Sequence, residues 1–560
     1  MNRLLPDWLR TYRRSSLGPD MTAGLTVAAM LAPQAMAYAM LAGLPPVMGL
    51  YASTIPLVIY ALAGSSRHLA VGPVAMVSLI VFAACRPLAL PGSEEYIRLV
   101  LSITLLAGVI QILLGLARAG FLVHFVSHSA VSGFTSAAAL VIIATQLKHI
   151  LGYDLPAERP FPEILSAAAL GLWQTHVPTM ISGIACLSFL YLMRRRAPRF
   201  PAALAAVILA ALAVRLLRLD EAGVMTVGAL PSGFAAPALP IPDFERLAAL
   251  APAVLAVVFI GFMESIAVAE SVAARSGYRI LPNRELVALG LADVASAVFS
   301  GAPVTGGFSR TAVSCQSGAR TQMSSLVTAA VIALVLVGFT GILRWVPRFA
   351  LASVIIIACL GLVDMAELRR LYRIRKSDGW ILLLTFLLTL LLGVERGLLS
   401  GIVFSLVLFI ARSARPHTAV LGYLPKEGLF RNVSRFPDAR TFPGVLILRV
   451  DASLNFANMA FVEDILRVKI GADPSLRQII LDVSGVNDMD AAALTSLQHF
   501  MERRRSLGLR FLMAGMKGPV RDIVGKAGWR EIFGEDIAHS SLPSALAAAG
   551  VQLGDSTPAV

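Results

Sequence analysis

Apolar residues occur in long blocks up to about residue 413, and short polar loops separate the blocks. The first set falls near residues 21–42, 44–63, 73–88, 97–118, 123–150, 177–194 and 201–217. A loop rich in Pro, Gly and Ala follows, and a second set falls near 250–275, 284–300, 309–320, 323–344, 349–364, 379–394 and 397–413. Because a helix needs about 20 residues to cross a bilayer, the pattern predicts an α-helical membrane protein with two sets of seven spans. The third block of each set is short and begins at a glycine-containing break.

Basic residues are concentrated in alternate loops. If the N-terminus is cytoplasmic, the loops after even-numbered spans should be basic. Those loops contain Arg67, Arg118, Arg194, Arg195, Arg196, Arg199, Arg275, Arg279, Arg284, Arg320 and the stretch 369–376, whereas Arg344 and Arg348 are exceptions. An odd number of spans per set gives the two halves opposite orientations. The pattern therefore indicates an inverted repeat, which is typical of secondary transporters.

Beyond Pro416 the pattern changes to short buried strands that alternate with helices. Strands are expected at 444–451, 476–486 and 509–515, and helices at 459–470, 491–507 and 520–528. This alternation predicts a small α/β domain, and the loop charges place it in the cytoplasm. It contains no GxxxxGK[ST] or GxGxxG phosphate-binding loop.

These patterns predict the organisation of the whole chain. We expect a cytoplasmic N-terminal segment 1–20, a transmembrane domain 21–415 with repeats of about 21–217 and 250–413, an α/β domain 416–550 and a tail 551–560. The basic N-terminus resembles the start of a signal peptide. However, the first apolar block is long and contains Pro33 and Gln34, so we interpret it as a retained span.

The composition agrees with a membrane protein and narrows its partners. Of the residues, 57% are hydrophobic and 15% are charged, whereas soluble domains average about 45–50% and about 25%. The net charge of +14 is compatible with nucleic-acid binding, but the Arg and Lys lie mostly in loops with few aromatic residues between them. Membrane topology explains that placement better, so no nucleic-acid partner is expected. The four cysteines lack CxxC spacing, so we expect no metal or other cofactor.

The segment Thr305-Gly306-Gly307-Phe308-Ser309-Arg310 places a charge within membrane-type sequence. A buried Arg costs about 2.5–3.5 kcal/mol on insertion scales, so its presence favours a functional site. Glycines open the backbone, and Ser309 is placed to cap the helix that follows. A helix N-terminus beside an Arg is a binding seat for an anion.

A second break, Val71-Gly72-Pro73-Val74-Ala75-Met76, occupies the equivalent place in the first half. Interrupted segments at corresponding positions of two repeats mark the substrate sites of transporters. Two helix N-termini that faced one another would hold an anion without a metal, because each carries about half a positive charge. The alternative is ordinary packing of helices around small residues.

Gln34 and Tyr38 lie in the first span, beside and about one helical turn after Pro33. Proline leaves backbone groups without partners, and these need a polar neighbour or a lined cavity. The two side chains can offer hydrogen-bond donors to a substrate. The alternative is hydrogen bonding between helices by Gln34 and a packing role for Tyr38.

Glu264 is a carboxylate inside the eighth apolar block. Burial disfavours the charged form of a carboxylate, so Glu264 is a candidate to exchange a proton near neutral pH. The alternative is a fixed structural pair, for example with Arg310. Glu270 lies nearer the basic end of the same block and is expected at the vestibule.

Several motifs together resemble the SulP family of sulfate permeases and related bicarbonate transporters and anion exchangers. They are PQAMAYA at 33–39, PVMGLYAS at 46–53, GSSR at 64–67, GYRI at 277–280, NREL at 283–286, TGGFSRTAVS at 305–314 and SGART at 317–321. Met48 departs from the aromatic or aliphatic residue expected there, and Asp293 replaces a common Asn. The resemblance covers nearly the whole chain.

The resemblance implies a seven-plus-seven inverted-repeat fold with core and gate domains, two short strands at the broken third and tenth spans, and a C-terminal STAS domain. It places an anion near Gln34, Tyr38, Val74, Ala75, Ser309 and Arg310. Proton-coupled sulfate members have a carboxylate that matches Glu264. The phosphorylatable Ser of bacterial anti-sigma relatives is absent, because the matching stretch is Asp490-Ala491-Ala492-Ala493. A homodimer is expected from the family.

The sequence thus favours a transporter rather than an enzyme. The leading hypothesis is sulfate uptake with proton symport by elevator-type alternating access. A sodium-coupled bicarbonate carrier, a proton-coupled dicarboxylate carrier, an anion exchanger and an anion channel are alternatives. A membrane-tethered sensor with the STAS domain as its output is a hypothesis of a different class. In each case we expect a multi-pass protein of the inner (plasma) membrane bilayer, with its N-terminus and STAS domain in the cytoplasm.

Overall fold

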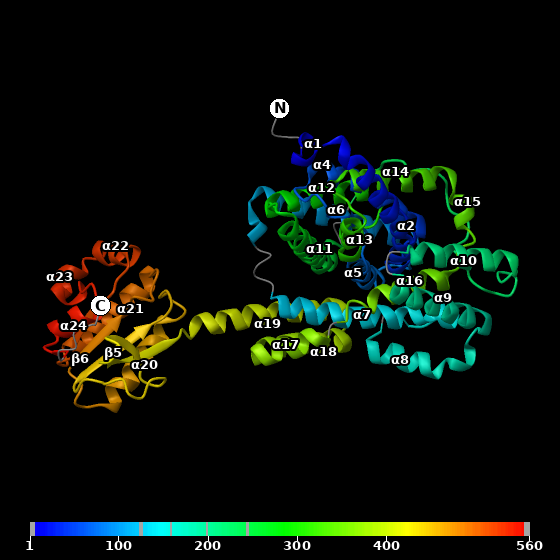
Figure 1. Ribbon diagram of the computed structural model, residues 1–560. Helices are drawn as coiled ribbons and strands as arrows, with labels where there is room; N and C mark the ends of the chain where they lie inside the picture. The colour runs from blue at the N-terminus through cyan, green and yellow to red at the C-terminus, as the bar shows by residue number, and fades with distance from the viewer. Residues whose placement is uncertain are drawn as a thin grey trace. The chain divides into compact units, whose positions relative to one another are not determined.

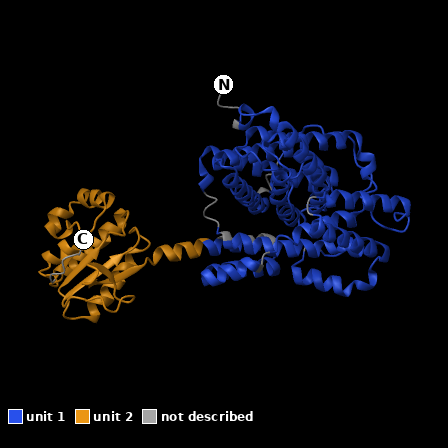
Figure 2. Cartoon of the chain, viewed as in Figure 1, with its two compact units in different colours: residues 1–405 blue, residues 406–560 orange. Residues whose placement is uncertain are grey.

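The computed structural model describes residues 6–121, 127–156, 159–197, 200–241, 246–363 and 365–553. The chain forms two compact units, residues 1–405 and 406–560 (Figure 2). Residues 1–5 of the expected N-terminal segment, the start of the expected span 123–150, Arg199 and most of the expected tail lie outside the described residues.

Unit 1 is helical, and each predicted apolar block corresponds to one helix or, at 44–63, to two (Figure 1); the last helix, α19, continues into unit 2. The first set consists of α2 (Leu17–Leu41), α3 (Pro46–Tyr51) with α4 (Ile55–Ala63), α5 (Ala75–Cys85), α6 (Glu94–Leu116), α7 (His128–Leu151), α9 (Val177–Arg196) and α10 (Ala202–Leu216). The second set consists of α11 (Leu247–Ser276), α12 (Pro282–Val298), α13 (Phe308–Gln316), α14 (Met323–Gly338), α16 (Arg348–Cys359), α18 (Lys376–Leu392) and α19 (Val394–Ala414). Short elements lie between them: α1 (Asp7–Arg10), η1 (Arg14–Ser16), α8 (Phe161–Leu170), η3 (Leu172–Gln174), α15 (Thr340–Leu343) and α17 (Met365–Ile374).

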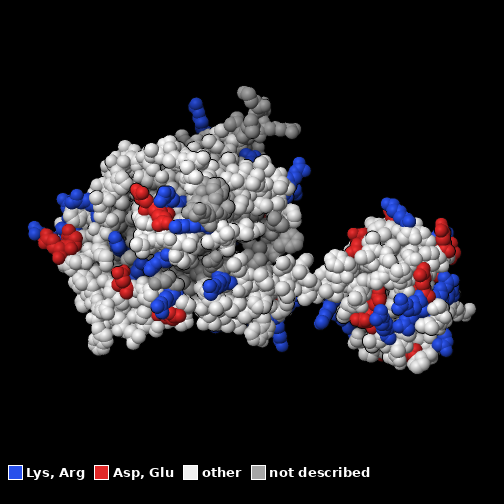
Figure 3. All heavy atoms as spheres, turned by 180° about the vertical axis from the view of Figure 1, so that it is seen from behind, with Lys and Arg blue, Asp and Glu red and all other residues white. Residues whose placement is uncertain are grey.

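Six helices in the described part of the chain are long and apolar enough to cross a membrane alone. They are Arg14–Leu41, Pro46–Ala63, Glu94–Leu116, Ser129–Leu151, Val177–Arg196 and Ala248–Ser276. Apart from α19, the other predicted spans are shorter helices, and α5 and α13 have only 11 and 9 residues. At a rise of 1.5 Å per residue, such helices reach only part of the way across a bilayer of about 30 Å. The face of unit 1 in Figure 3 is mostly uncharged, as a lipid-facing surface should be.

The two backbone breaks pair with each other. Strand β1 (Val71–Gly72) lies antiparallel to β2 (Thr305–Gly306), with Val71 opposite Gly306 and Gly72 opposite Thr305. Two residues separate β1 from α5, and one residue separates β2 from α13. Figure 1 shows both short helices beside α11, which contacts each of them. The pairing therefore brings the starts of two half-length helices together.

The predicted cap of α13 is wrong. Gly307 occupies the N-cap position, and no side chain caps the helix. Ser309 lies inside the first turn instead, because helical geometry begins at Phe308. A Ser at that position cannot accept the bond that an N-cap side chain accepts, since its own amide is one of the unpaired donors.

Close backbone contact between α6 and α12 joins the two repeats. A Cβ atom added at Gly290 would lie 2.5 Å from the Gly108 carbonyl oxygen, and one added at Gly108 would lie 2.7 Å from the Gly290 carbonyl oxygen. Small residues let membrane helices approach to this distance. Dispersion contacts then stabilise the helix pair, because the hydrophobic effect does not drive helices together within lipid. The two glycines therefore set the spacing of the crossing.

Unit 2 is a five-stranded sheet in the order β4-β3-β5-β6-β7. Strands β5 (Val445–Val450), β6 (Gln478–Asp482) and β7 (Arg510–Ala514) are parallel, and each lies within a predicted strand. Helices α20 (Met459–Ala472), α21 (Ala491–Arg505) and α22 (Gly518–Lys526) match the predicted helices, while α23 (Trp529–Phe533), η4 (Gly534–Ile537) and α24 (Leu542–Ala548) were not predicted. The antiparallel strands β3 (Thr418–Leu424) and β4 (Leu429–Asn432) were also missed, because they are partly exposed and lack a continuous apolar run.

We predict that Gly290→Ala lowers the stability of the folded protein by about 1–3 kcal/mol, because the added methyl group meets a backbone oxygen that cannot move aside. The measurement is the thermal unfolding midpoint of the full-length protein in detergent. Gly338→Ala is the matched control, since nothing lies within 4 Å of a Cβ atom at that helical position. Equal midpoints for the two variants would contradict the close crossing of α6 and α12.

Candidate functional site

Arg310 lies between the two backbone breaks and donates hydrogen bonds to both. Its side chain is only 1% exposed. Nη1 donates to the Pro73 carbonyl at 2.6 Å, and Nη2 donates to the carbonyls of Gly72 at 3.1 Å and Thr305 at 3.3 Å. Because Gly72 and Pro73 lead into α5 and Thr305 belongs to β2, one guanidinium connects the two half-length helices.

Hydroxyl groups hold β2 against α11. Ser265 Oγ donates to the Gly261 carbonyl at 2.6 Å, accepts from the Gly306 amide at 2.8 Å and lies 2.7 Å from Thr305 Oγ1. Thr305 Oγ1 in turn donates to the Gly261 carbonyl at 2.7 Å. All of these groups are buried, so each polar atom needs such a partner inside the protein.

The segment before β1 is held by a buried carboxylate from the second repeat. Glu285 accepts hydrogen bonds from the Tyr60 hydroxyl at 2.6 Å, the Ser65 amide at 2.6 Å and the Ser66 amide at 3.0 Å. Thr311 Oγ1 accepts from the Ala70 amide at 3.0 Å. Residues of the GSSR and NREL motifs thus bond to each other, and their hydrogen bonds position the segment that leads into β1.

Asp293 holds the approach to β2 and does not line the cavity described below. Its carboxylate is fully buried, and Oδ1 accepts from the Val304 amide at 2.7 Å, directly before β2 begins. The side-chain oxygen of an Asn could accept the same bond. The departure from the common Asn therefore keeps this positioning contact.

A cavity of about 620 Å³ contains every substrate-site residue predicted from the sequence. Its wall includes Gln34, Tyr38, Val74, Ala75, Glu264, Ser309 and Arg310. The lining residues come from α2, α5, α11 and α13 and from a second group, α9, α10 and α16, whose helices contact one another. Within the described ranges, no group of three or more metal-ligating side chains occurs. The positive character of the closed end thus comes from Arg310 and from the helix N-termini.

The cavity runs along α2 from an exposed end to a buried end. Thr22, Thr26, Met30, Gln34 and Tyr38 line it at four-residue spacing, and each is turned about 40° around the helix from the one before. Thr22 is exposed, Thr26 and Met30 are half-buried, and Gln34 and Tyr38 are buried. The cavity therefore opens at the N-terminal end of α2 and ends beside the half-length helices.

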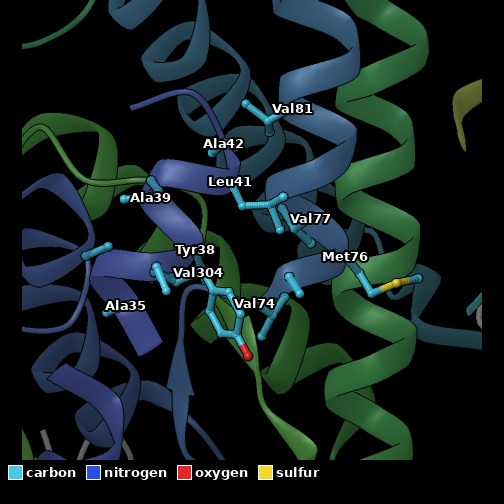
Figure 4. Close-up of a cluster of buried hydrophobic side chains, with 14 of the residues drawn as sticks. Ala35, Tyr38, Ala39, Leu41, Ala42, Val74, Met76, Val77, Val81 and Val304 are labelled. Carbon is cyan, nitrogen blue, oxygen red and sulfur yellow. The ribbon is translucent and has the colours of Figure 1, made fainter. Parts of the chain in front are cut away.

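Unpartnered polar atoms converge at the buried end. Gln34 Oε1, Glu264 Oε2 and Arg310 Nε are buried and have no hydrogen-bond partner among the described residues. Figure 4 shows the Tyr38 ring beside Val74, with its hydroxyl pointing away from the apolar cluster. A buried polar group without a partner costs about 1–3 kcal/mol, so these atoms are arranged for a polar ligand or water.

The first turns of α5 and α13 add backbone donors to this end. Neither helix has a side-chain cap, so the amides of their first residues are open to a ligand. Ala75 and Ser309 lie in these turns and line the cavity. The arrangement suits an anion, because amide N–H groups and the positive ends of two helices point at the same space.

The structure adds cavity residues that the sequence did not single out for the site. Phe308 is 60% exposed within the wall, and Arg194 lies at the exposed end. The charge pattern gave Arg194 only a role in topology. Because α9 and α13 are far apart in sequence, no local pattern could have shown that both line one cavity.

Comparison with known families matches both parts of the chain. The Sulfate permease family matches residues 17–385, and the STAS domain matches residues 436–543. The chain is 35% identical over 549 residues to sulfate transporter 4.1, chloroplastic, of Arabidopsis thaliana, covering 94% of this chain and 80% of that protein. It is 36% identical over 543 residues to a probable sulfate transporter of Mycobacterium tuberculosis, covering 96% of both chains.

Solved structures share the fold. The murine Slc26a9 anion transporter, described in an inward-facing state, superposes with a TM-score of 0.91 at 23% identity, covering 98% of this chain and 94% of that one. The transmembrane domain of the cyanobacterial bicarbonate transporter BicA superposes with a TM-score of 0.61 at 21% identity, covering 70% of this chain and 98% of that one. The predicted fold class is confirmed. The chain belongs to the sulfate permease family and carries a C-terminal STAS domain.

Proposed function

We propose that this protein is a secondary transporter that carries sulfate together with a proton by elevator-type alternating access. The observation that supports the proposal best is the pair of uncapped helix N-termini beside Arg310 at the buried end of a cavity. The relatives named as sulfate transporters favour sulfate. Anion transport is the common property of the family, whereas the substrate, the coupling ion and the mechanism are our proposal.

In the proposed bound state, the anion sits between the first turns of α5 and α13. Amides near Ala75 and Ser309 donate to its oxygens, and Arg310 Nε supplies a charged donor that has no acceptor within the described ranges. Gln34 and Tyr38 complete the site from α2. Charge-assisted donors and helix dipoles act strongly here because little water screens them.

The hydrogen bonds around Arg310 favour a site that moves as one body. The guanidinium, the β1–β2 pairing and Ser265 tie α5, α11 and α13 together. The second group of lining helices is α9, α10 and α16. We propose that the first group forms the core domain, which carries the anion past the second group, the gate domain.

Glu264 is proposed as the group that carries the coupled proton. It lines the same cavity as Arg310, and its Oε2 atom is buried without a hydrogen-bond partner. A carboxyl group can bind and release one proton, so a carboxyl in the cavity of the anion can carry the coupled proton. Glu264 therefore favours proton coupling over the sodium-coupled bicarbonate and exchange alternatives.

The topology and assembly remain proposals. The loop charges favour a cytoplasmic N-terminus and STAS domain in the inner (plasma) membrane. We keep the proposed domain boundary near residue 416, two residues before β3 begins. Resemblance to the family supports a homodimer.

Asp490 caps α21 by accepting from the Ala493 amide at 2.7 Å, which favours a structural role for the stretch that replaces the phosphorylated turn.

We predict that Arg310→Ala lowers sulfate uptake into proteoliposomes by about tenfold to 100-fold, because a charged hydrogen bond contributes about 1.5–3 kcal/mol. Arg320→Ala is the matched control, since that side chain is exposed and lies outside the cavity wall. Gly307→Ala tests the same geometry without removing charge, because its Cβ atom would lie 2.7 Å from Arg310 Cζ. Uptake at the parent rate in folded Arg310→Ala protein would refute the site.

We predict that Glu264→Gln preserves sulfate binding but removes the pH dependence of uptake. Parent uptake should fall as external pH rises, because alkaline medium removes the proton that accompanies the anion. Gln mimics the protonated form at every pH. Initial uptake rates across a pH series test this, with Glu270→Gln as the control because Glu270 is exposed on the same helix. A parent-like pH profile for Glu264→Gln would assign this residue a structural role.

A further inference from the structure

Arg194 brings a charge to the exposed end of the cavity. It lies in the last turn of α9, its side chain is exposed, and it forms part of the cavity wall. Its Nη1 donates to the Ile357 carbonyl in α16 at 2.7 Å. The side chain is therefore held in place by a neighbouring helix, unlike a free surface arginine.

The end of α16 explains why Arg194 is held there. Amides beyond the helix donate to the carbonyls of Ile356, Ala358 and Cys359, and Arg194 donates to the one between them, Ile357. A cation at a helix C-terminus is also favoured by the helix dipole. A Cβ atom at Gly361 would lie 2.8 Å from Arg194 Nη2, so the glycine leaves space for the guanidinium.

The neighbouring arginines of α9 lie outside the cavity wall. Arg195 stacks over the Tyr191 ring, with its Cζ atom 4.7 Å from the ring centroid. Arg196 is exposed and does not line the cavity. Two residues on a helix differ by about 200° around its axis, so Arg194 and Arg196 have the same charge but face different directions.

Charges divide the cavity into two zones. Among the described residues, its charged side chains are Arg194 at the exposed end and Glu264 and Arg310 at the buried end. The polar lining residues that carry no charge include Thr22, Thr26 and Gln316. Arg310 also donates to three backbone carbonyls, whereas Arg194 donates one bond and is open to water.

We propose that Arg194 attracts the oxyanion at the cavity mouth and favours divalent anions over monovalent ones. This inference rests on the proposed transport function. A single positive charge within about 8 Å of the path, in a water-filled mouth, raises the local concentration of a monovalent anion about twofold and of a divalent anion about fivefold. Salt weakens the effect, since the Debye length falls from about 30 Å at 0.01 M to about 8 Å at 0.15 M.

The test uses inverted membrane vesicles containing the full-length protein, which present this mouth to the medium under the proposed topology. The measurement is kcat/KM for labelled sulfate and for labelled bicarbonate at about 0.01 M and about 0.15 M ionic strength, set with potassium gluconate. Arg194→Gln should lower kcat/KM about fivefold for sulfate, or about twofold for bicarbonate, at low ionic strength. The loss should shrink at high ionic strength.

Three comparisons decide between charge and structure. Arg194→Lys keeps the charge and should therefore have the parent kcat/KM and the parent dependence on ionic strength. Arg196→Gln removes the same charge from the same helical turn but outside the cavity, so it should also leave both quantities unchanged. If Arg194→Gln and Arg194→Lys lose activity equally at both ionic strengths, the role is structural and the proposal is wrong. If Arg194→Gln matches the parent, the proposal fails while the transport function stands. If the parent protein moves neither anion, the transport function fails, and the inference fails with it.

Discussion

The fold of the candidate site depends on one buried guanidinium. Burying a charge is costly unless hydrogen bonds replace its water, and Arg310 finds three backbone carbonyls inside the protein. Those carbonyls belong to segments from both repeats. The same hydrogen bonds therefore replace the water around the charge and join the two repeats. A substitution there removes a structural cross-link as well as a positive charge.

Several weaker interactions support this cross-link by fixing the backbone that presents the carbonyls. The β1–β2 pairing sets the register, Ser265 and Thr305 hold β2 to α11, and Asp293 fixes the residue before β2. On the other side, Glu285 and Thr311 hold the segment that enters β1. Because the backbone is fixed in this way, the first turns of α5 and α13 can present amides to a ligand without reorganising on binding.

The cavity connects the candidate site to the surface at one end of α2. Along α2 the lining residues change from the exposed Thr22 to the buried Gln34 and Tyr38, so the cavity is open at the N-terminal end of this helix. Arg194 belongs to the group formed by α9, α10 and α16, whereas Arg310 belongs to the group that contains the half-length helices. Under the mechanism that we propose, attraction at the mouth and binding at the buried end could therefore change independently.

The sequence by itself determined the spans, the two glycine-containing breaks, the three parallel strands of the STAS domain and a few of the residues that line the cavity. These follow from local causes: hydrophobic period, the length of a bilayer span and the backbone freedom of glycine. The sequence did not determine that Gly307 rather than Ser309 is the N-cap residue of α13, that Arg310 bonds to the carbonyls of Gly72 and Pro73, or that Arg194 reaches Ile357. Only the tertiary structure decided these, because each depends on the packing of helices far apart in the chain, and no local pattern encodes which buried donor meets which acceptor.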